Sequence, residues 1–378
     1  MMHGERDRGA TRSRWGLVGP VRPFRGGIAQ YTTMLHREFS RQGRAMTISF
    51  RQLYPRWIYP GRSLHEPGEA IDGESGVSYS LTPYNPFSST RAAQHFKAGG
   101  VEGVIVMWWT VFLAPAIGLL AWSLRRLEIP VCFLCHNVSD HETSWWKRLV
   151  AQKVLSGGTR FLVHSSKDAE VLKALVPRAS VVTHPHPVYS QFPEPRQIFA
   201  RSADLEILFF GLVRDYKGLD ILAEAMKRLG SAPIHLAVVG EWWIKDNKLR
   251  ASLDDMPNVD VVDKYVAADE VSEYFSRADV VVVPYRNATG SGVVSLAYHY
   301  GRAVIATRVG GLPDVVEDGV SGKLIDAEDP DALAQAIKWF LDVSPDQLSA
   351  GVKKVASRMT WESLISAITA SGERSKHD

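Results

Sequence analysis

Cysteine is almost absent from this sequence, which has two cysteines in 378 residues, Cys132 and Cys135. They lie three apart in an apolar VCFLC run, and a β-strand would place them on opposite faces. This spacing disfavours a local disulfide or a metal pair. It favours two buried thiols in a reducing cytoplasm.

Long apolar runs are absent as well. No uninterrupted apolar stretch reaches the roughly 18 residues that a membrane-spanning helix needs. The first 14 residues are polar, so they lack the apolar segment of a secretory signal. We therefore expect a disordered tail over residues 1–14, followed by a globular cytoplasmic protein.

Acidic residues are scarce in the first half of the chain. The formal net charge is +3, but residues 1–195 contain 23 Lys and Arg against 14 Asp and Glu, whereas the remainder contains 21 against 27. A basic first half suits peripheral contact with an anionic membrane or a phosphorylated acceptor, with ordinary solvated charge as the alternative. No concentrated basic run or nucleic-acid module occurs, so nucleic acid is not an expected partner.

Short apolar strand candidates alternate with helical patterns along the whole chain, and 378 residues favour two domains. Alternation of this kind predicts the α/β class, with two Rossmann-like, doubly wound domains. The expected strands are 15–18, 46–50, 103–107, 131–135, 161–163, 181–183, 206–210, 234–239, 259–262, 280–283, 304–306 and 323–325. Four prolines within residues 184–195 predict the linker, because proline continues neither helix nor strand.

Glycine turns follow three of the expected strands in the second half. The strand Leu205–Phe210 runs into GLVRDYKG, which carries Arg214 and Lys217. A later strand precedes the turn Gly290-Ser291-Gly292, and the next one precedes Gly310-Gly311. Glycine at a strand–helix junction lets backbone N–H groups approach a ligand, and a helix N-terminus attracts anions. The pattern therefore indicates a nucleotide-diphosphate ligand.

Four blocks in this order resemble the retaining GT-B glycosyltransferases of family four, also described as glycosyl transferases group 1. They are PFRGGIAQY, CHN, GLVRDYKGLD and ATGSGV…AYHYGRAVIATRVGGLPDVVEDGVSG. The resemblance implies two Rossmann-like domains facing across a cleft. It assigns residues 15–190 to an acceptor-side domain, 191–358 to a nucleotide-sugar-binding domain, and 359–378 to a helix that crosses back to the first domain.

The resemblance also implies the parts of a donor site. Arg214 and Lys217 match the family's pair of pyrophosphate-binding cations, which stabilise negative charge on the leaving phosphate. The alternative is a solvated basic helix start. The residues expected against the donor diphosphate and sugar are Gly26, Gly27, Thr289, Gly290, Ser291, Gly292 and Val293, with plain glycine turns as the alternative.

One part of the family pattern is missing. Many relatives carry two glutamates eight residues apart across the second glycine turn, and the resemblance aligns Ala288 and Leu296 with them. Neither side chain can hydrogen-bond to a sugar or a ribose. A subgroup with ATQSG-like turns shares this loss. Recognition of the ribose and of the sugar is therefore left unassigned.

Further candidates come from strand ends and from the same resemblance. His136, directly after an expected strand, matches a family histidine that positions the transferred sugar, and we expect it to assist catalysis. Glu241, Tyr265 and Val266 fall where the family lodges the nucleoside base. On the acceptor side we expect Trp108, Trp109 and His141, although core packing accounts for the tryptophan pair equally well.

Two remaining patterns concern membranes and metals. Residues 145–150, WWKRLV, place aromatic side chains beside cations, which suits a membrane interface as well as a partly buried helix with a solvated edge. Asp329-Pro-Asp331 has the spacing of a metal motif, but it precedes a helical pattern and reads as a cap. No metal or other cofactor is expected.

Taken together, the sequence predicts a metal-independent, retaining hexosyltransferase. It would transfer a hexose from a UDP- or GDP-sugar to a glycan or lipid-linked acceptor, forming an α-linkage by front-face displacement. One alternative is a nucleotide-sugar epimerase, which the missing glutamates disfavour. Another is a catalytically inactive relative that binds a partner, which the retained Arg214 and Lys217 disfavour. The sugar, the base and the oligomeric state are not specified by the sequence.

Overall fold

The structure is a computed structural model of the chain and describes residues 14–53, 73–138, 144–189, 192–195, 200–245, 247–267, 270–343 and 345–369. Packing divides the chain into two compact units. The first comprises the residues up to Phe161 together with Leu175–Ser180, and the second comprises Leu162–Ala174 and everything from Val181 onward. The described parts of segment 184–195, where prolines predicted a linker, contain neither helix nor strand.

A seven-stranded sheet with the order β3-β2-β1-β4-β5-β6-β7 forms the core of the N-terminal part of the chain. Its strands are β1 (Trp15–Val18), β2 (Ala45–Phe50), β3 (Val77–Leu81), β4 (Gly103–Trp108), β5 (Val131–Cys135), β6 (Arg160–Val163) and β7 (Val181–Thr183). β1 pairs in parallel with β2 and β4, so Leu17 lies between Thr47 and Ile105. Six of these strands confirm the sequence expectation. β3 was not expected, because Ser78 and Ser80 interrupt its apolar pattern.

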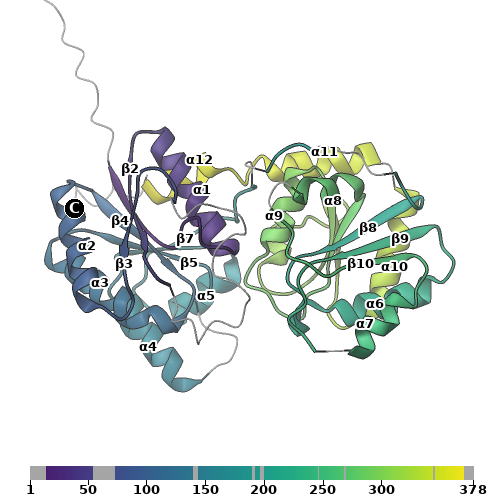
Figure 1. Ribbon diagram of the computed structural model, residues 1–378, viewed down its shortest axis with the longest axis horizontal. Coiled ribbons are helices and arrows are strands. Elements are labelled where there is room, and N and C mark those ends of the chain that lie inside the picture. The colour runs from purple at the N-terminus through teal and green to yellow at the C-terminus, as the bar shows by residue number, and fades with distance from the viewer. Residues whose placement is uncertain are drawn as a thin grey trace, which may run out of the picture. The chain divides into compact units, whose positions relative to one another are not determined.

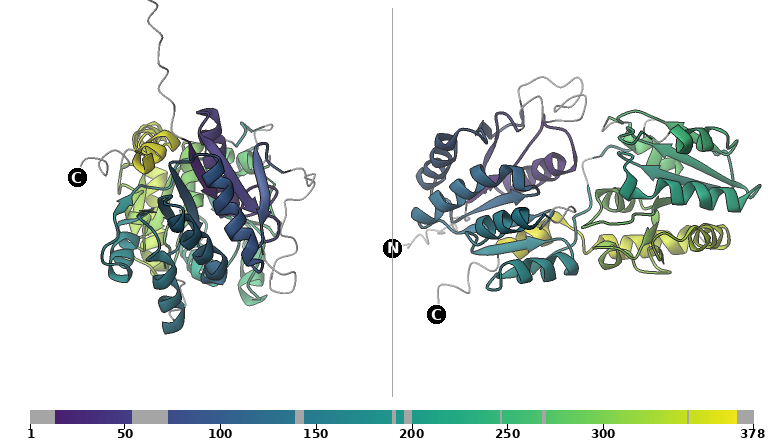
Figure 2. Two further views of the ribbon diagram at one scale, coloured as in Figure 1. Left: turned by 90° about the vertical axis from the view of Figure 1, so that its left-hand side faces the viewer. Right: turned by 90° about the horizontal axis from the view of Figure 1, so that it is seen from below.

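Helices cover both faces of this sheet (Figures 1 and 2). They are α1 (Gly27–Arg41), α2 (Pro86–Ala98), the 3-10 turn η1 (Val111–Leu113), α3 (Ala114–Arg126), α4 (Trp145–Leu155) and α5 (Ser166–Leu175). The connection from β1 to β2 crosses the sheet in one direction, and the connections from β3 to β4 and from β4 to β5 cross it in the other. Because such crossovers are right-handed, α1 lies on one face of the sheet and α2 and α3 lie on the other. On the other face α3 packs between α2 and α4. Each of these three helices begins at the edge where the strands end.

The second unit is built on a six-stranded sheet with the order β10-β9-β8-β11-β12-β13. Its strands are β8 (Leu205–Phe210), β9 (Ile234–Val239), β10 (Val259–Val262), β11 (Val280–Val283), β12 (Ala303–Thr307) and β13 (Gly322–Ile325). All six confirm the expected strands. Their valines and isoleucines form nearly continuous apolar runs, as in parallel sheets that are buried on both faces. The fold class is therefore the one predicted, two parallel-sheet, Rossmann-like layers covered by helices.

Helices again cover both faces of the second sheet (Figure 1). They are α6 (Leu219–Leu229), α7 (Asn247–Asp254), α8 (Val271–Arg277), α9 (Gly292–His299), α10 (Pro330–Asp342) and α11 (Pro345–Ala356), with 3-10 turns η2 (Asp215–Lys217) and η3 (Leu312–Asp314). A further helix, α12 (Trp361–Thr369), follows α11 in the chain. α10 packs on α6, and α11 packs on α9. The strand order reverses between β8 and β11. In open α/β sheets the crevice at such a reversal, outside the strand C-termini, is where ligands bind.

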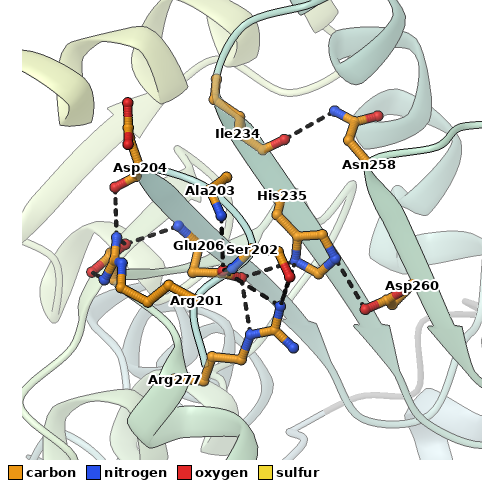
Figure 3. A network of polar contacts seen from close by, with 11 residues as sticks. Arg201, Ser202, Ala203, Asp204, Glu206, Ile234, His235, Asn258, Asp260 and Arg277 are labelled. Atoms are coloured by element: carbon orange, nitrogen blue, oxygen red, sulfur yellow. Dashed lines mark hydrogen bonds and ion pairs between the residues drawn. The ribbon is translucent and has the colours of Figure 1, made fainter. Parts of the chain in front are cut away.

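A polar cluster closes the opposite edge of the second sheet (Figure 3). The Glu206 carboxylate, at the start of β8, is buried and lies 2.9 Å from Nδ1 of His235 and 3.1 Å from Nε of Arg277. Asp260 contacts the other ring nitrogen of His235 at 3.0 Å. Because this cluster lies at the N-terminal ends of the strands and is internally paired, it stabilises the fold rather than binding a ligand.

The last helix, α12, is hydrogen-bonded to the proline-rich segment. The indole Nε1 of Trp361 donates to the Val188 carbonyl oxygen at 3.0 Å, and Nε2 of His184 lies 2.8 Å from Oγ of Ser363. These bonds tie α12 to residues 184–188. Among the described residues no helix is long and apolar enough to cross a bilayer.

Candidate functional site

Two glycines shape the turn that follows β8. Gly211 comes directly after the strand and has a φ of 95°. A Cβ on Gly240, which follows β9, would lie 2.0 Å from the Gly211 carbonyl oxygen. Only glycine at position 240 therefore lets the loops after the two neighbouring strands touch, so both loops form one closely packed strand-end edge.

Lys217 is a buried cation beside this turn. It ends η2, and its side chain is 7% exposed. Its Nζ lies 3.1 Å from the position that a Cβ on Gly211 would occupy. Burial, and then the positive charge of Arg214, lower the lysine pKa to about 8. No carboxylate in the described part of the chain pairs with this ammonium, and its ring neighbour is Tyr285, with the ring centroid 5.5 Å away.

Arg214 is positioned by ring stacking. Its guanidinium carbon lies 4.5 Å from the centroid of the Trp243 ring. The Trp243 amide donates to the Val213 carbonyl oxygen at 3.0 Å. This bond holds the loop after β9 beside the loop after β8, and the Trp243 indole therefore lies next to Arg214. Within the ranges that the structure describes, Arg214 has no ion pair with a carboxylate. Two cations without counter-ions there, Arg214 and Lys217, thus share one strand end.

The turn between β11 and α9 is packed against the second glycine pair. Ser291 is the N-cap of α9 and is buried. A Cβ on Gly310 would lie 1.4 Å from the Ala288 carbonyl oxygen, and one on Gly311 would lie 2.6 Å from the Thr289 carbonyl oxygen. The glycines at 310–311 therefore make room for the 288–291 backbone. The turn before α9 and the turn after β12 pack directly against each other.

The start of α9 and the Lys217 ammonium meet at Gly211. Cγ2 of Val293, in the first turn of α9, is 3.8 Å from the same Cβ position that lies 3.1 Å from Nζ of Lys217. The first turn of α9 contains no acidic residue, so its N–H groups and dipole contribute further positive potential. Gly290 is exposed and Thr289 half-buried, which opens this turn to solvent. The edge between β8 and β11 can therefore receive a multivalent anion.

Ala288 and Leu296, which the resemblance in the sequence aligned with two family glutamates, are both buried. Ala288 packs against Gly310, and Leu296 faces the core from α9. The structure therefore offers no carboxylate at these two places.

The residues predicted for the nucleoside lie at the ends of neighbouring strands. Glu241 follows β9 and accepts the Val213 amide through its carbonyl oxygen at 2.9 Å. Tyr265 and Val266 follow β10, with Tyr265 half-buried and Val266 buried. β9 and β10 are adjacent and parallel, so all three residues belong to one edge. Their role in binding a base stays a prediction.

In the first unit, Gly26 and Gly27 form an open helix start. Gly26 is the N-cap of α1 with a φ of 104°, and a Cβ on either glycine would meet no atom within 4 Å. His136 follows β5, and its amide donates to the Trp108 carbonyl oxygen at 2.8 Å. The His136 ring packs edge-on against Tyr31, with the centroids 4.6 Å apart. Both glycines and His136 thus lie after strands of the first sheet, near its strand-end edge.

The tryptophan pair divides between core and surface. Trp108 is 1% exposed and packs edge-on against Phe133, so it offers no face on which a sugar can stack. Core packing, the alternative that the sequence left open, is its observed role. Trp109 is half-buried, and its carbonyl oxygen accepts from the Asn137 amide group at 3.3 Å. His141 lies outside the described residues.

Two aromatic residues of this site were missed by the sequence reasoning. Trp243 supports Arg214, and Tyr285 lies under the Lys217 ammonium. The signal was present, because Trp243 comes two residues after Glu241 and Tyr285 follows Pro284 at the end of β11. Which cation each ring contacts depended on the packing of loops that are distant in sequence.

The described residues contain no group of three or more His, Cys, Asp or Glu side chains placed to hold a metal ion. Asp329 is the N-cap of α10, where its Oδ1 accepts from the Ala332 amide at 2.8 Å, which confirms the predicted cap. Asp331 pairs with Arg228 at 2.6 Å. The Asp-x-Asp motif is therefore a structural element of α10.

Known proteins resemble this chain over nearly its whole length. The family described as glycosyl transferases group 1 matches residues 204–342. A D-inositol 3-phosphate glycosyltransferase of Stackebrandtia nassauensis is 32% identical, over 89% of this chain and 84% of the relative. One of Corynebacterium diphtheriae is 26% identical, over 89% of this chain and 87% of the relative.

Solved structures share the fold at low sequence identity. Sucrose-phosphate synthase of Thermosynechococcus elongatus superposes with a TM-score of 0.70 at 19% identity, covering 96% of this chain and 98% of that one. Anabaena HepE, in complex with UDP and glucose, gives a TM-score of 0.67 at 15% identity, covering 95% and 99%.

The two parallel-sheet domains and their structural neighbours define the GT-B fold. The chain belongs to the glycosyl transferases group 1 family.

Proposed function

We propose that this enzyme is a metal-independent, retaining hexosyltransferase that uses a UDP- or GDP-sugar. The observation that carries the proposal is the buried Lys217 ammonium, which has no carboxylate partner among the described residues and lies beside the first turn of α9. A buried charge without a partner is costly, and a bound diphosphate supplies the missing counter-ion. Arg214 adds a second cation at the same strand end.

The proposed reaction breaks the bond between the anomeric carbon of the hexose and the oxygen of the leaving phosphate. The acceptor hydroxyl oxygen forms the new bond on the same face of the sugar, so the anomeric configuration is kept. The departing phosphate oxygen accepts the hydroxyl proton. Negative charge grows on the nucleoside diphosphate during this step, and Arg214, Lys217 and the N–H groups of the 289–293 turn stabilise it.

The other predicted residues keep the roles that the family resemblance gives them. Within the first unit, His136 would position the transferred sugar, Gly26 and Gly27 would allow close approach of the donor, and the half-buried Trp109 would meet the acceptor. Glu241 and the 265–266 segment would border the nucleoside. Closure of the protein around the donor would exclude water and suppress hydrolysis.

We propose a glycan or a lipid-linked molecule at the cytoplasmic face of a membrane as the acceptor. The names of the relatives favour a second candidate, a phosphorylated cyclitol, because D-inositol 3-phosphate glycosyltransferases match this chain over about nine-tenths of its length. The remaining alternative is a catalytically inactive relative that serves as a binding subunit. The lack of carboxylates at Ala288 and Leu296 favours it.

A thermal-shift series with UDP, GDP, ADP and dTDP, each with and without EDTA, tests the donor site. We expect one nucleotide to stabilise the protein to the same extent in both conditions. The Lys217→Met and Arg214→Ala variants should lose this stabilisation. If both variants showed the same thermal shift as the wild type, the assignment of the diphosphate site to Arg214 and Lys217 would be wrong.

Transfer is tested separately with the matching sugar nucleotide and two acceptors, a lipid-linked glycan and inositol phosphate. Product with an α-linkage from an α-linked donor supports a retaining transferase, and the productive acceptor decides between the two candidates. Nucleotide binding without any transfer or donor hydrolysis would support the inactive relative instead.

A further inference from the structure

Three helices on one face of the first sheet, α2, α3 and α4, contain no acidic residue. The ranges 86–98, 114–126 and 145–155 contain neither Asp nor Glu. They contain seven cations: Arg91, Lys97, Arg125, Arg126, Lys147, Arg148 and Lys153. Asp140 and Glu142, which precede α4 in the sequence, lie outside the described residues.

The same face exposes large apolar side chains. Among the described residues of the first unit, every large hydrophobic side chain that is prominently exposed lies on these helices or directly before them. They are Tyr84, Phe87, Phe112, Trp122, Trp145, Trp146 and Leu149. Trp145 is 75% exposed, which is far from the usual burial of a tryptophan. Large exposed apolar side chains that gather on one set of helices are typical of a contact surface.

Most of these side chains gather at one edge. Phe87 is in the first turn of α2, Phe112 is in η1 before α3, and Trp145 and Trp146 begin α4. The three helices run side by side, and each starts where a parallel strand ends, so their first turns share an edge (Figure 1). Leu149 extends this apolar row along α4, because residues three and four apart share a helix face.

Charge complementarity identifies the occupant. Exposed aromatic rings with lysine and arginine beside them, and without carboxylates on the same helices, fit the interface of an anionic bilayer. Nζ of Lys147 lies 5.9 Å from the Trp146 ring, and Arg126 lies 4.9 Å from the Trp122 ring. A protein partner would require a complementary acidic and apolar surface, whereas anionic lipid provides both chemistries in one layer.

We propose that the α2–α3–α4 face, led by Trp145, Trp146 and Lys147–Arg148, docks the enzyme on a membrane rich in anionic lipid. The first turns of these helices lie at the strand-end edge of the first sheet, and Trp109 and His136 follow strands at the same edge. Docking through the helices would therefore bring Trp109 and His136 close to the lipid headgroups. This consequence rests on the proposed function, since it assumes that the acceptor is lipid-linked.

Vesicle sedimentation of the full chain tests the docking. The protein should bind phosphatidylcholine vesicles that contain phosphatidylglycerol, fail to bind phosphatidylcholine alone, and be released by salt. Each cation near such a surface contributes about fivefold in partitioning, so Lys147→Glu/Arg148→Glu should bind at least about 20-fold more weakly. Trp145→Ser/Trp146→Ser should lose binding as well. Lys353→Glu/Lys354→Glu, on exposed positions of α11, makes the same charge change and should bind normally.

The α4 variants alter the exposed Trp145, Trp146 and Arg148 and the half-buried Lys147, and none of these residues belongs to the candidate donor site. Their thermal stability and nucleotide binding should therefore match the wild type. Wild-type protein that ignores anionic vesicles, or α4 variants that bind them as well as wild type, would overturn the docking surface. So would a dimer that Trp145→Ser/Trp146→Ser dissociates while vesicle binding persists, because the face would then join two copies. Since nucleotide binding is measured separately, failure of docking and failure of the proposed function remain distinguishable.

Discussion

The guanidinium carbon of Arg214 lies over the indole of Trp243, 4.5 Å from the ring centroid, and the guanidinium has no carboxylate partner in the described part of the chain. The contact joins the loop after β8 to the loop after β9. It holds a cation at the strand-end edge without neutralising it. An arginine held this way stays available to a phosphate, which a salt bridge would have blocked.

Replacement of Trp243 by Leu should weaken binding of the nucleoside diphosphate about two- to fivefold. The reason is that a partly exposed cation–π contact contributes about 0.5–1 kcal/mol to holding the arginine. Isothermal titration with the nucleotide that gives the largest thermal shift measures the change. Trp242→Leu is the matched control, because Trp242 stacks on Arg250, which pairs with Asp254, and it should bind normally. Equal loss in both variants would contradict the role of Trp243.

Removal of the Lys217 charge should stabilise the unliganded protein and abolish nucleotide binding. The folded-state pKa of about 8 is below the ordinary value of 10.5, so keeping this lysine charged at pH 7 opposes folding. Lys217→Met should therefore raise the free energy of unfolding by up to about 3 kcal/mol at that pH. Urea denaturation measures the gain, and a destabilised variant would contradict the assignment of Lys217 as a buried, unpaired cation.

The affinity for the nucleoside diphosphate should fall as the pH rises above about 8. A bound anion raises the pKa of Lys217, so binding is strongest at pH values where this lysine is already protonated in the free protein. Above the pKa of the free protein, the affinity falls by at most tenfold per pH unit. Titrations between pH 6 and pH 10 would show the decline. Lys217→Arg provides the comparison, since arginine stays charged over this range and should show a flat profile.

Gly310→Ala should disrupt the turn that begins α9. The new Cβ would lie 1.4 Å from the Ala288 carbonyl oxygen at a residue with a φ of 55°, so the 288–291 backbone must move. We expect a loss of several kcal/mol in unfolding free energy and no nucleotide-induced thermal shift. Gly301→Ala is the control, because its φ of 66° is similar but its Cβ would meet no atom within 4 Å. That variant should lose only about 1–2 kcal/mol and keep the shift.

Glu206→Ala should destabilise the protein without changing nucleotide affinity. The buried carboxylate pairs with His235 and Arg277 at the edge opposite the candidate site. Removing one partner from a buried ionic cluster typically costs about 3–5 kcal/mol, because the remaining charge is left uncompensated. Chemical denaturation gives the cost, and titration at a temperature where the variant is folded gives the affinity. A large change in affinity would mean that this cluster is coupled to the site.

Most strands of the fold could be predicted from the sequence, because parallel strands that are buried on both faces appear in it as nearly continuous apolar runs. Twelve of the thirteen strands in the described part of the chain were predicted in this way. The exception, β3, is at the sheet edge, where one side of the strand lacks a neighbour and serines are tolerated.

The candidate site was predictable only where its chemistry is local. Arg214 and Lys217 follow a strand in a glycine-rich loop, so their approach to an anion could be inferred from seven consecutive residues. The sequence did not distinguish the roles of Trp108 and Trp109. Alternation along β4 and the packing of Phe133 decided that the first is buried and the second reaches the strand-end edge.

By itself, the sequence determined the order of strands and helices, the glycines that permit close turns, and two cations placed after one strand. These are local consequences of backbone geometry and side-chain type. The tertiary structure decided that Lys217 is buried beside α9 without a described counter-ion, and that Trp243 supports Arg214. It also decided that the acid-free helices α2, α3 and α4 share one exposed face. Each of these depends on loops or helices far apart in sequence, which only the packing of the sheets brings together.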